Sequence, residues 1–255
     1  MIKQKAYKSV IILYKFNMAK VQLEVSIPQS LSAIKLHQYQ KYLSVAKNVE
    51  DSDKNNEFLN LKALEIFCGL TLKESYGLPV SMFESVLKQL SDCFDESTGL
   101  VNRFKMTGSD GVTAEFGFIP NLDKMSFGEY IDLESYITDW DNMHKAMAVM
   151  YRPIVAGKKH LYEIEPYEGS EKWADVMKDA PVSVALGAVV FFYRLGNKLS
   201  RYTMSSLLAQ EKETESTVLK RALEESGVGI NQYMDLLEEM SKNLTQLPKF
   251  HYTPA

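Results

Sequence analysis

The sequence "DWDNMH" places two acids and a histidine close together, and these residue types bind transition metals. The candidate ligands are Asp139, Asp141 and His144. A tetrahedral site needs further ligands, and the chain offers no His-x-x-x-His motif or cysteine pair to supply them. We favour the alternative that these residues are solvated and cap a helix. The sequence therefore predicts no bound metal, and nothing in it indicates another cofactor.

A second acidic group lies in "EIEPYE", which contains Glu163, Glu165 and Glu168. Paired carboxylates carry out the acid and base steps of glycoside hydrolysis. Charges on the solvent-facing side of a strand would show the same spacing, and we favour that interpretation. The segment "GSDG" lacks the lysine and the strand-loop-helix context of a phosphate-binding loop, and the chain has no Gly-x-Ser-x-Gly elbow. The sequence thus predicts a protein that is not an enzyme.

Composition narrows the classes of partner. The chain has 255 residues, a formal net charge of −4 and 45% hydrophobic residues, which is typical of a globular protein in water. It has no basic run to bind nucleic acid phosphates. The longest apolar run, Val184–Tyr193, is about half of the roughly 20 residues that cross a bilayer. We expect neither nucleic acid nor membrane as a partner, and we expect Cys68 and Cys93 to be buried free thiols in a reducing cytosol.

Two stretches of the chain resemble each other. The segment "EVSIPQSLSAIKLHQY" ends at Tyr39, and "EFGFIPNLDKMSFGEY" ends at Tyr130. Two further matches follow in the same order: "LNLKALEIFCGL" with "MHKAMAVMYRPI", and "GLPVSMFESVLKQL" with "DAPVSVALGAVVFFYRL". Three matches in one order favour an internal duplication over the common use of strand-turn-helix patterns. If the units are equivalent, replacing Tyr39 or Tyr130 by alanine should destabilise the fold to a similar extent.

These patterns predict a mainly α fold of the α+β class. It would contain two related helical units with short leading strands, a connecting β-hairpin and C-terminal helices. We expect an N-terminal extension at residues 1–17, the first unit at 18–100 and the hairpin at 101–118. The second unit is expected at 119–200, with a β insertion at 155–180, and the C-terminal helices at 201–255.

Local signals place some elements within this plan. The segment "TLKE" at Thr71 fits a capping box and predicts a helix start. The polar, acidic stretch Asn48–Glu57 is typical of a surface loop. "MHKAMAVMYRPI" predicts a helix that Pro153 stops, and Ser170 can cap a short helix that carries Trp173.

The helix that follows the second Pro-Val-Ser, "VALGAVVFFY", is apolar on every side and must be covered all round. Covering an extra face of about 300 Å² contributes about 7 kcal/mol before entropy. Either a partner or the amphipathic helices expected in Leu207–Leu244 would cover it. We favour internal cover, because Ile230, Tyr233, Met234, Leu237, Met240 and Leu244 fall on one helical stripe.

The second unit also carries a resemblance to a known group of proteins. The stretch "FGFIPNLDKMSFGEYIDLESYITDWDNMHKAMAVMYRPI", followed by "YEIEPYEG" and "APVSVALGAVVFFYRLG", resembles a family of tailed-bacteriophage proteins from structural gene modules. The resemblance covers roughly Ser26 to Gly196 and is weaker in the first unit. The chain has Met150 where the family more often has leucine.

This resemblance implies a tail assembly chaperone or a virion structural protein. A chaperone of this kind would keep the tape-measure protein soluble in the bacterial host cytoplasm, whereas a connector, neck or baseplate subunit would remain in the virion. The partners implied are other phage structural proteins, such as tape-measure, tail or neck proteins, and the chain itself as a possible homo-oligomer. Methionines form adaptable apolar surfaces, and the tyrosines of the insertion suit a contact surface. The predicted interaction residues are Met143, Met147, Tyr151, Arg152, Tyr162, Tyr167 and Trp173.

Overall fold

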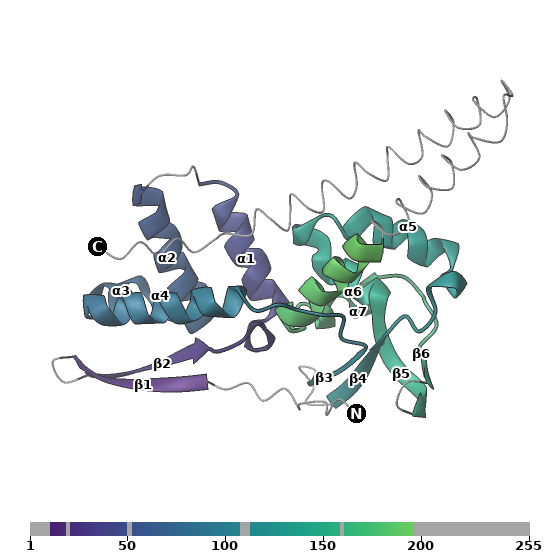
Figure 1. The fold of residues 1–255 in the computed structure, drawn as a ribbon, viewed down its shortest axis with the longest axis horizontal. Helices are drawn as coiled ribbons and strands as arrows, with labels where there is room; N and C mark the ends of the chain where they lie inside the picture. Colours follow the sequence, from purple (N-terminus) through teal and green to yellow (C-terminus); the bar gives the residue numbers. More distant parts are fainter. Residues whose placement is uncertain (1–10, 19–20, 50–52, 108–112, 159–160, 196–255) are drawn as a thin grey trace, which may run out of the picture.

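The protein is elongated, with one helical unit at each end (Figure 1). The computed structural model describes residues 11–18, 21–49, 53–107, 113–158 and 161–195. Helices dominate, and they pack with a two-stranded and a four-stranded antiparallel sheet. The prediction of a mainly α fold of the α+β class is confirmed.

The first unit consists of a β-hairpin and a group of helices. Its elements are β1 (Ile11–Met18), β2 (Val21–Pro28), the 3-10 helix η1 (Leu31–Ala33), α1 (Leu36–Ala46), α2 (Asp53–Cys68), α3 (Leu72–Gly77) and α4 (Val80–Phe94). Residues 11–17, which we assigned to an extension, belong to β1, and this strand pairs with β2 along its whole length. The expected surface loop Asn48–Glu57 is shorter than predicted, because α2 already begins at Asp53.

The second unit begins with another hairpin. Its elements are β3 (Arg103–Thr107), β4 (Thr113–Phe118), η2 (Leu122–Lys124), α5 (Phe127–Tyr136), η3 (Trp140–Asn142), α6 (Met143–Met150), β5 (Tyr151–Lys158), β6 (Leu161–Ile164) and α7 (Glu171–Met177). A further helix begins at Val182 and is described to residue 195. We refer to it as helix 182–195.

The predicted connecting hairpin and the predicted β insertion form a single sheet. Its strand order is β3-β4-β5-β6, so the insertion extends the hairpin through pairing of Phe116 with Pro153. The helix that was expected to continue until Pro153 ends earlier, at Met150, and the chain continues as β5. The cause is Pro153, which disfavours helical geometry at Arg152 and removes a backbone donor.

The two units share the order of their elements. Each has a hairpin, a 3-10 helix, a first helix, a second helix, a variable segment and a helix that begins at the valine of Pro-Val-Ser, and the second unit has one further 3-10 helix, η3, before its second helix. The first helices α1 and α5 begin at Leu36 and Phe127, which the sequence alignment places opposite each other. A common origin of the units stays a prediction, but their local geometry follows the same register.

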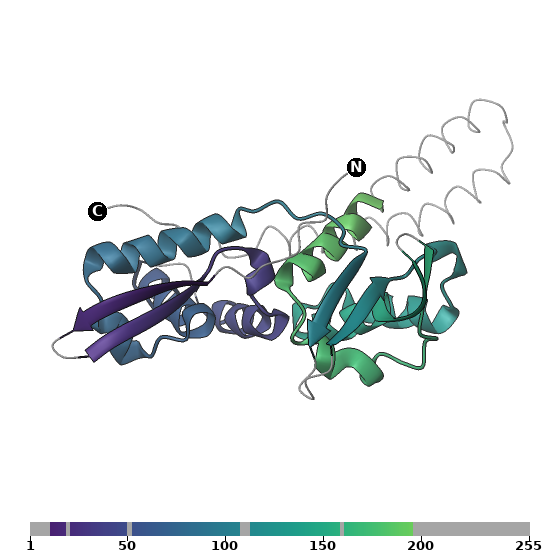
Figure 2. The same cartoon turned by 90° about the horizontal axis from the view of Figure 1, so that it is seen from below.

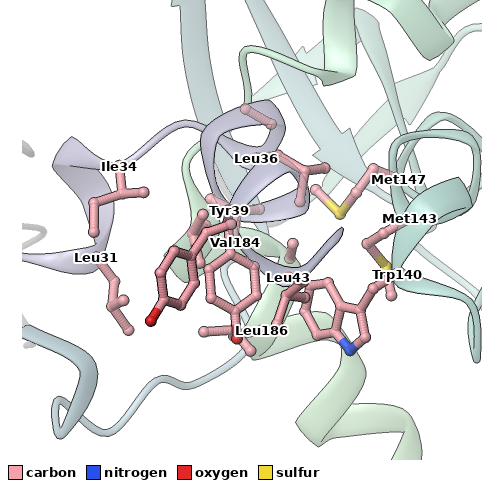
Figure 3. Close-up of a cluster of buried hydrophobic side chains, with 14 of the residues drawn as sticks. Leu31, Ile34, Leu36, Tyr39, Leu43, Trp140, Met143, Met147, Val184 and Leu186 are labelled. Atoms are coloured by element: carbon pink, nitrogen blue, oxygen red, sulfur yellow. The ribbon is translucent and has the colours of Figure 1, made fainter. Parts of the chain in front are cut away.

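Both units contribute to one hydrophobic core (Figure 3). Tyr39 of α1 lies edge-on against Trp140 of the second unit, with ring centroids 5.2 Å apart. Beside them lie Met143, Met147, Val184 and Leu186, which are buried. The segments before α1 and before helix 182–195 also pair, through a bridge between Lys35 and Pro181. The units are therefore parts of one folded body.

Helix 182–195 lies at the junction of the units (Figure 2). Val182, Ala185 and Ala188 are fully buried. Its aromatic end packs on β4, where Phe118 contacts Phe191 edge-on at 5.6 Å. The predicted covering segment Leu207–Leu244, with the rest of the predicted C-terminal helices, lies outside the described residues. Within the part of the chain that is described, no helix is long and apolar enough to span a membrane.

A substitution at Gly187 would test the close packing of this junction. A Cβ atom added there would collide with the backbone carbonyl of Gly99. Because that carbonyl cannot rotate away as a side chain can, we expect Gly187→Ala to lower the free energy of unfolding by about 2 kcal/mol. Urea denaturation would measure the loss. Gly99→Ala is the matched control, since a Cβ there meets nothing within 4 Å, and equal stability of both variants would contradict the packing.

The paired tyrosines differ in environment, which corrects the expectation of equal effects. Tyr39 is fully buried, whereas Tyr130 is 53% exposed. We expect Tyr39→Ala to lower the free energy of unfolding by about 3–5 kcal/mol, as for other buried aromatic truncations, and Tyr130→Ala to change it by less than about 1 kcal/mol. Thermal and urea unfolding of both variants would check this. A large loss in Tyr130→Ala would show that its side chain is covered.

Candidate functional site

The segments that carry the resemblance meet at one cleft beside the start of α5. The cleft has a volume of about 330 Å³. Its walls come from Ile119–Lys124, from Ser126 and Glu129, from Arg152, and from Ile164–Tyr167. These segments are distant in sequence and meet because β4, β5 and β6 are neighbours in the sheet and α5 packs on α6. The second unit thus builds a site from its most distinctive sequences.

A buried ion pair forms the floor of this cleft. Arg152 Nη2 lies 2.5 Å from Glu129 Oε1, and both side chains are only 7% exposed. Glu129 is also the third residue of α5 and accepts a hydrogen bond from the Ser126 backbone N–H at 2.6 Å. The Ser126 hydroxyl accepts in turn from the Glu129 N–H, which completes a capping box. One carboxylate therefore caps α5 and fixes the arginine.

The environment of Glu129 keeps it ionised. Burial alone would raise the pKa of its carboxyl group. The hydrogen bonds from Ser126 and Arg152, together with the arginine charge, outweigh burial and hold the pKa below its ordinary value. Glu129 is therefore a carboxylate at neutral pH and is unsuited to act as a general acid there.

Arg152 is held from three sides. Its Nη1 donates to the Val149 carbonyl at 3.2 Å, and the guanidinium lies 5.3 Å from the centre of the Tyr167 ring. The Tyr167 hydroxyl donates a short hydrogen bond to Asp132. Arg152 Nε is buried and has no hydrogen-bond partner within the described chain. The cleft is thus lined by a fixed arginine side chain whose Nε is not accessible to solvent.

The acidic group in "EIEPYE" is tied to neighbouring side chains. Glu165 accepts from Lys172 at 2.9 Å and from the Trp173 indole at 2.7 Å, and the Lys172 hydrogen bond is the main reason that its pKa is lowered. Glu168 accepts from the same Lys172 at 2.6 Å, while Glu163 is exposed on β6. Strand and surface charges therefore account for this segment.

The first candidate metal site is a helix start. Asp139 caps η3 by accepting from the Asp141 N–H at 3.0 Å, Asp141 pairs with Lys47 at 2.9 Å, and His144 contacts Gln40 at 3.1 Å. Among the residues that the structure describes, no group of three His, Cys, Asp or Glu side chains is arranged to hold a metal ion.

Both cysteines are buried and free, as the sequence predicts. Burial raises the pKa of Cys68 to about 12 and that of Cys93 to about 11. At neutral pH both are therefore neutral thiols, which are poor nucleophiles.

The predicted interaction residues separate into two groups. Met143, Met147 and Tyr151 are fully buried and pack the core, so they present no surface to a partner. The remaining residues surround or support the cleft. Arg152 and Tyr167 line it, Trp173 holds Glu165, and Tyr162 fixes β6 by donating to the Phe118 carbonyl at 2.8 Å.

Sequence reasoning missed Glu129, Lys124 and the exposed face of α5. The segment "SFGE" is a capping-box pattern that could have indicated Glu129. On α5, Phe127 is 80% exposed, and Tyr130 and Ile131 are exposed beside it. At the other end of the protein, Leu72, Tyr76 and Val80 are exposed near a groove of about 300 Å³. Large exposed apolar groups of this kind mark contact surfaces.

Comparison with known proteins adds no functional information to these observations. No family model, curated protein or solved structure matches the chain.

The buried ion pair predicts a pH dependence of stability. Because the pKa of Glu129 is lowered in the fold, its ionised form stabilises the protein fully above the ordinary value of 4.5, and this contribution is lost as the pH falls through the folded pKa. Glu129→Gln should lower the free energy of unfolding at neutral pH by about 3 kcal/mol, since the Arg152 charge stays buried without a counter-charge. Urea unfolding across this pH range should show a shallower decline for the variant.

Glu74→Gln is the matched control for this experiment. Glu74 completes the capping box of α3 with Thr71, as Glu129 does for α5 with Ser126, but among the described residues it has no arginine partner. We expect a much smaller loss at neutral pH. Identical pH profiles for Glu129→Gln and the unchanged protein would show that the ion pair does not stabilise the fold.

Proposed function

We propose that the chain binds other proteins during virion assembly, in the manner of a tail assembly chaperone, and catalyses no reaction. The observation that carries this proposal is the cleft beside α5, which is lined by the fixed Arg152 side chain and by the exposed Lys124. The Lys124 ammonium group carries N–H donors that suit the peptide carbonyl and carboxylate oxygens of a partner protein.

The other groups of the cleft support protein binding over catalysis. Its two acids are both engaged, Glu129 by Ser126 and Arg152, and Glu165 by Lys172 and Trp173. A general base needs a carboxylate that is free to take a proton. The group left available at the rim is Lys124, which forms no ion pair within the described ranges and suits an acidic partner segment.

The resemblance to structural-module proteins of tailed phages directs the proposal to virion assembly. The partner would then be a tape-measure, tail or neck protein. A permanent virion subunit is the second candidate, favoured by the exposed apolar side chains at both ends of the molecule. Subunits of rings and tubes need such contacts at two separate surfaces. A chaperone leaves the particle after assembly, whereas a subunit stays in it.

Cross-linking from the cleft would test the proposal. A photo-reactive phenylalanine analogue replaces Lys124 in the full chain, produced in host cells that assemble the particle. We expect it to cross-link to one virion protein, because its side chain borders the cleft. The control position is Lys105, which is exposed on β3 and does not line the cleft. Mass spectrometry of purified particles then separates the chaperone, which is absent, from the subunit, which is present.

Two results would contradict the proposal. One is equal cross-linking from Lys124 and Lys105, which would mean that the cleft does not recognise the partner. The other is a metal ion or nucleotide that co-purifies with the chain in stoichiometric amount, because this would return the cleft to the class of enzyme sites.

A further inference from the structure

Helices α1 and α5 occupy the same place in their units and turn the same side toward their own core. Tyr42 of α1 and Leu133 of α5, which the alignment pairs, are both buried. At the third residue of each helix, Gln38 and Glu129 accept a hydrogen bond from the backbone N–H of the cap. The inner sides of the two helices are therefore equivalent.

Their outer sides differ sharply. On α1, Leu36 and Tyr39 are fully buried, and Tyr39 contacts Trp140 of the second unit as well as Phe94 of its own unit (Figure 3). The paired residues on α5 are Phe127 and Tyr130, which are 80% and 53% exposed. The same helix face is thus an interface in the first unit and is exposed in the second.

The surface against which α1 packs lies at the start of helix 182–195, and its counterpart in the first unit is exposed. In the second unit, Pro-Val-Ser begins helix 182–195, and Val182 is fully buried where its N–H donates to the Ile34 carbonyl at 2.9 Å. In the first unit, Pro-Val-Ser begins α4, and Val80 is 73% exposed. The receiving surface at the start of helix 182–195 is therefore covered by α1, whereas the equivalent surface at the start of α4 is exposed.

A terminal repeat that ends an array normally carries a polar outer face. Neither end of this protein does, because Phe127, Tyr130 and Ile131 are exposed at one end and Leu72 and Val80 at the other. Figure 1 shows the start of α4 and α5 toward opposite ends of the molecule. Both ends therefore resemble internal repeats, whose apolar faces are covered by a neighbouring repeat.

We infer that the outer face of α5 docks on the α4 start of a second copy of this chain. The contact repeats the one that α1 makes with helix 182–195 inside each chain. Because the two surfaces differ and lie apart, the association is head-to-tail and produces a ring or a filament. Phe127, Tyr130 and Val80 do not line the cleft, so the contact goes beyond the proposed function, and its test uses neither Lys124 nor cross-linking.

We expect contacts between apolar side chains, and not ion pairs, to stabilise this association. Inside the chain, the α1 interface is bordered by ion pairs from Lys35 to Asp179 and from Lys47 to Asp141. The alignment places Ser126 and Thr138 at the two lysine positions in the second unit. Without those charges the contact between copies should depend little on salt, since screening acts on exposed ion pairs.

Sedimentation of the full chain tests the inference. The unchanged protein should form species larger than a monomer, with little change at high salt. Tyr130→Asp removes the docking face and Val80→Asp removes the receiving face, so each variant alone should be monomeric. A mixture of the two variants retains one intact interface and should form a one-to-one dimer that does not extend. Lys105→Glu, on an exposed position of β3, should assemble like the unchanged protein.

Other occupants of the α5 face would give different results. If the chain's own residues 207–244 cover it, the unchanged protein is monomeric and Tyr130→Asp lowers the melting temperature. If only a foreign protein binds there, the unchanged protein is monomeric and both variants keep its melting temperature. Either result overturns the inference, as does assembly that survives both substitutions or a mixture that stays monomeric.

Discussion

The structure depends on a short antiparallel contact between two segments that are far apart in the sequence. The Leu36 N–H donates to the Ala180 carbonyl at 2.8 Å, the His37 N–H to Lys178 at 2.9 Å, and the Val182 N–H to Ile34 at 2.9 Å. These bonds bring the first turn of α1 against the first turn of helix 182–195. They satisfy backbone donors that helix starts would otherwise leave unpaired, and they set the orientation in which Tyr39 reaches Trp140. One core results because this contact joins the units at their helix ends.

The sequence predicted the helix starts and the register that short-range patterns determine. The capping box of Thr71 and Glu74, the helix after the second Pro-Val-Ser and the register between α1 and α5 all follow from short-range patterns. It did not predict the joining of the hairpin with β5 and β6, because antiparallel pairing over a long separation leaves no periodic signal. The N-terminal strand β1 was missed because residues 1–17 were assigned to an extension that precedes the first unit.

At the candidate site, too, the sequence predicted some features and missed others. An apolar periodicity cannot distinguish a core from a groove, so the methionines of α6 were assigned to a surface although they are buried. The Glu129–Arg152 pair was not predicted because many acids could have paired with that arginine. Its counterpart in the first unit is neutral: Gln38 donates to the Ile66 carbonyl at 2.9 Å, near the end of α2. Both links tie the start of the first helix to the end of the second, but only the charged one borders an open cleft.

This difference explains how the second unit is free to carry a surface. On α1 both sides contribute to folding, because one side packs in its own unit and the other forms the junction, so its residues are not free to vary. On α5, Glu129 and Leu133 anchor the inner side with an ion pair and a buried leucine. The outer side is then not needed for stability, and apolar residues there lower solubility without strengthening the fold. Within the described part of the chain Phe127 and Tyr130 are exposed, so a contact with another copy explains them better than a role in the packing of these residues.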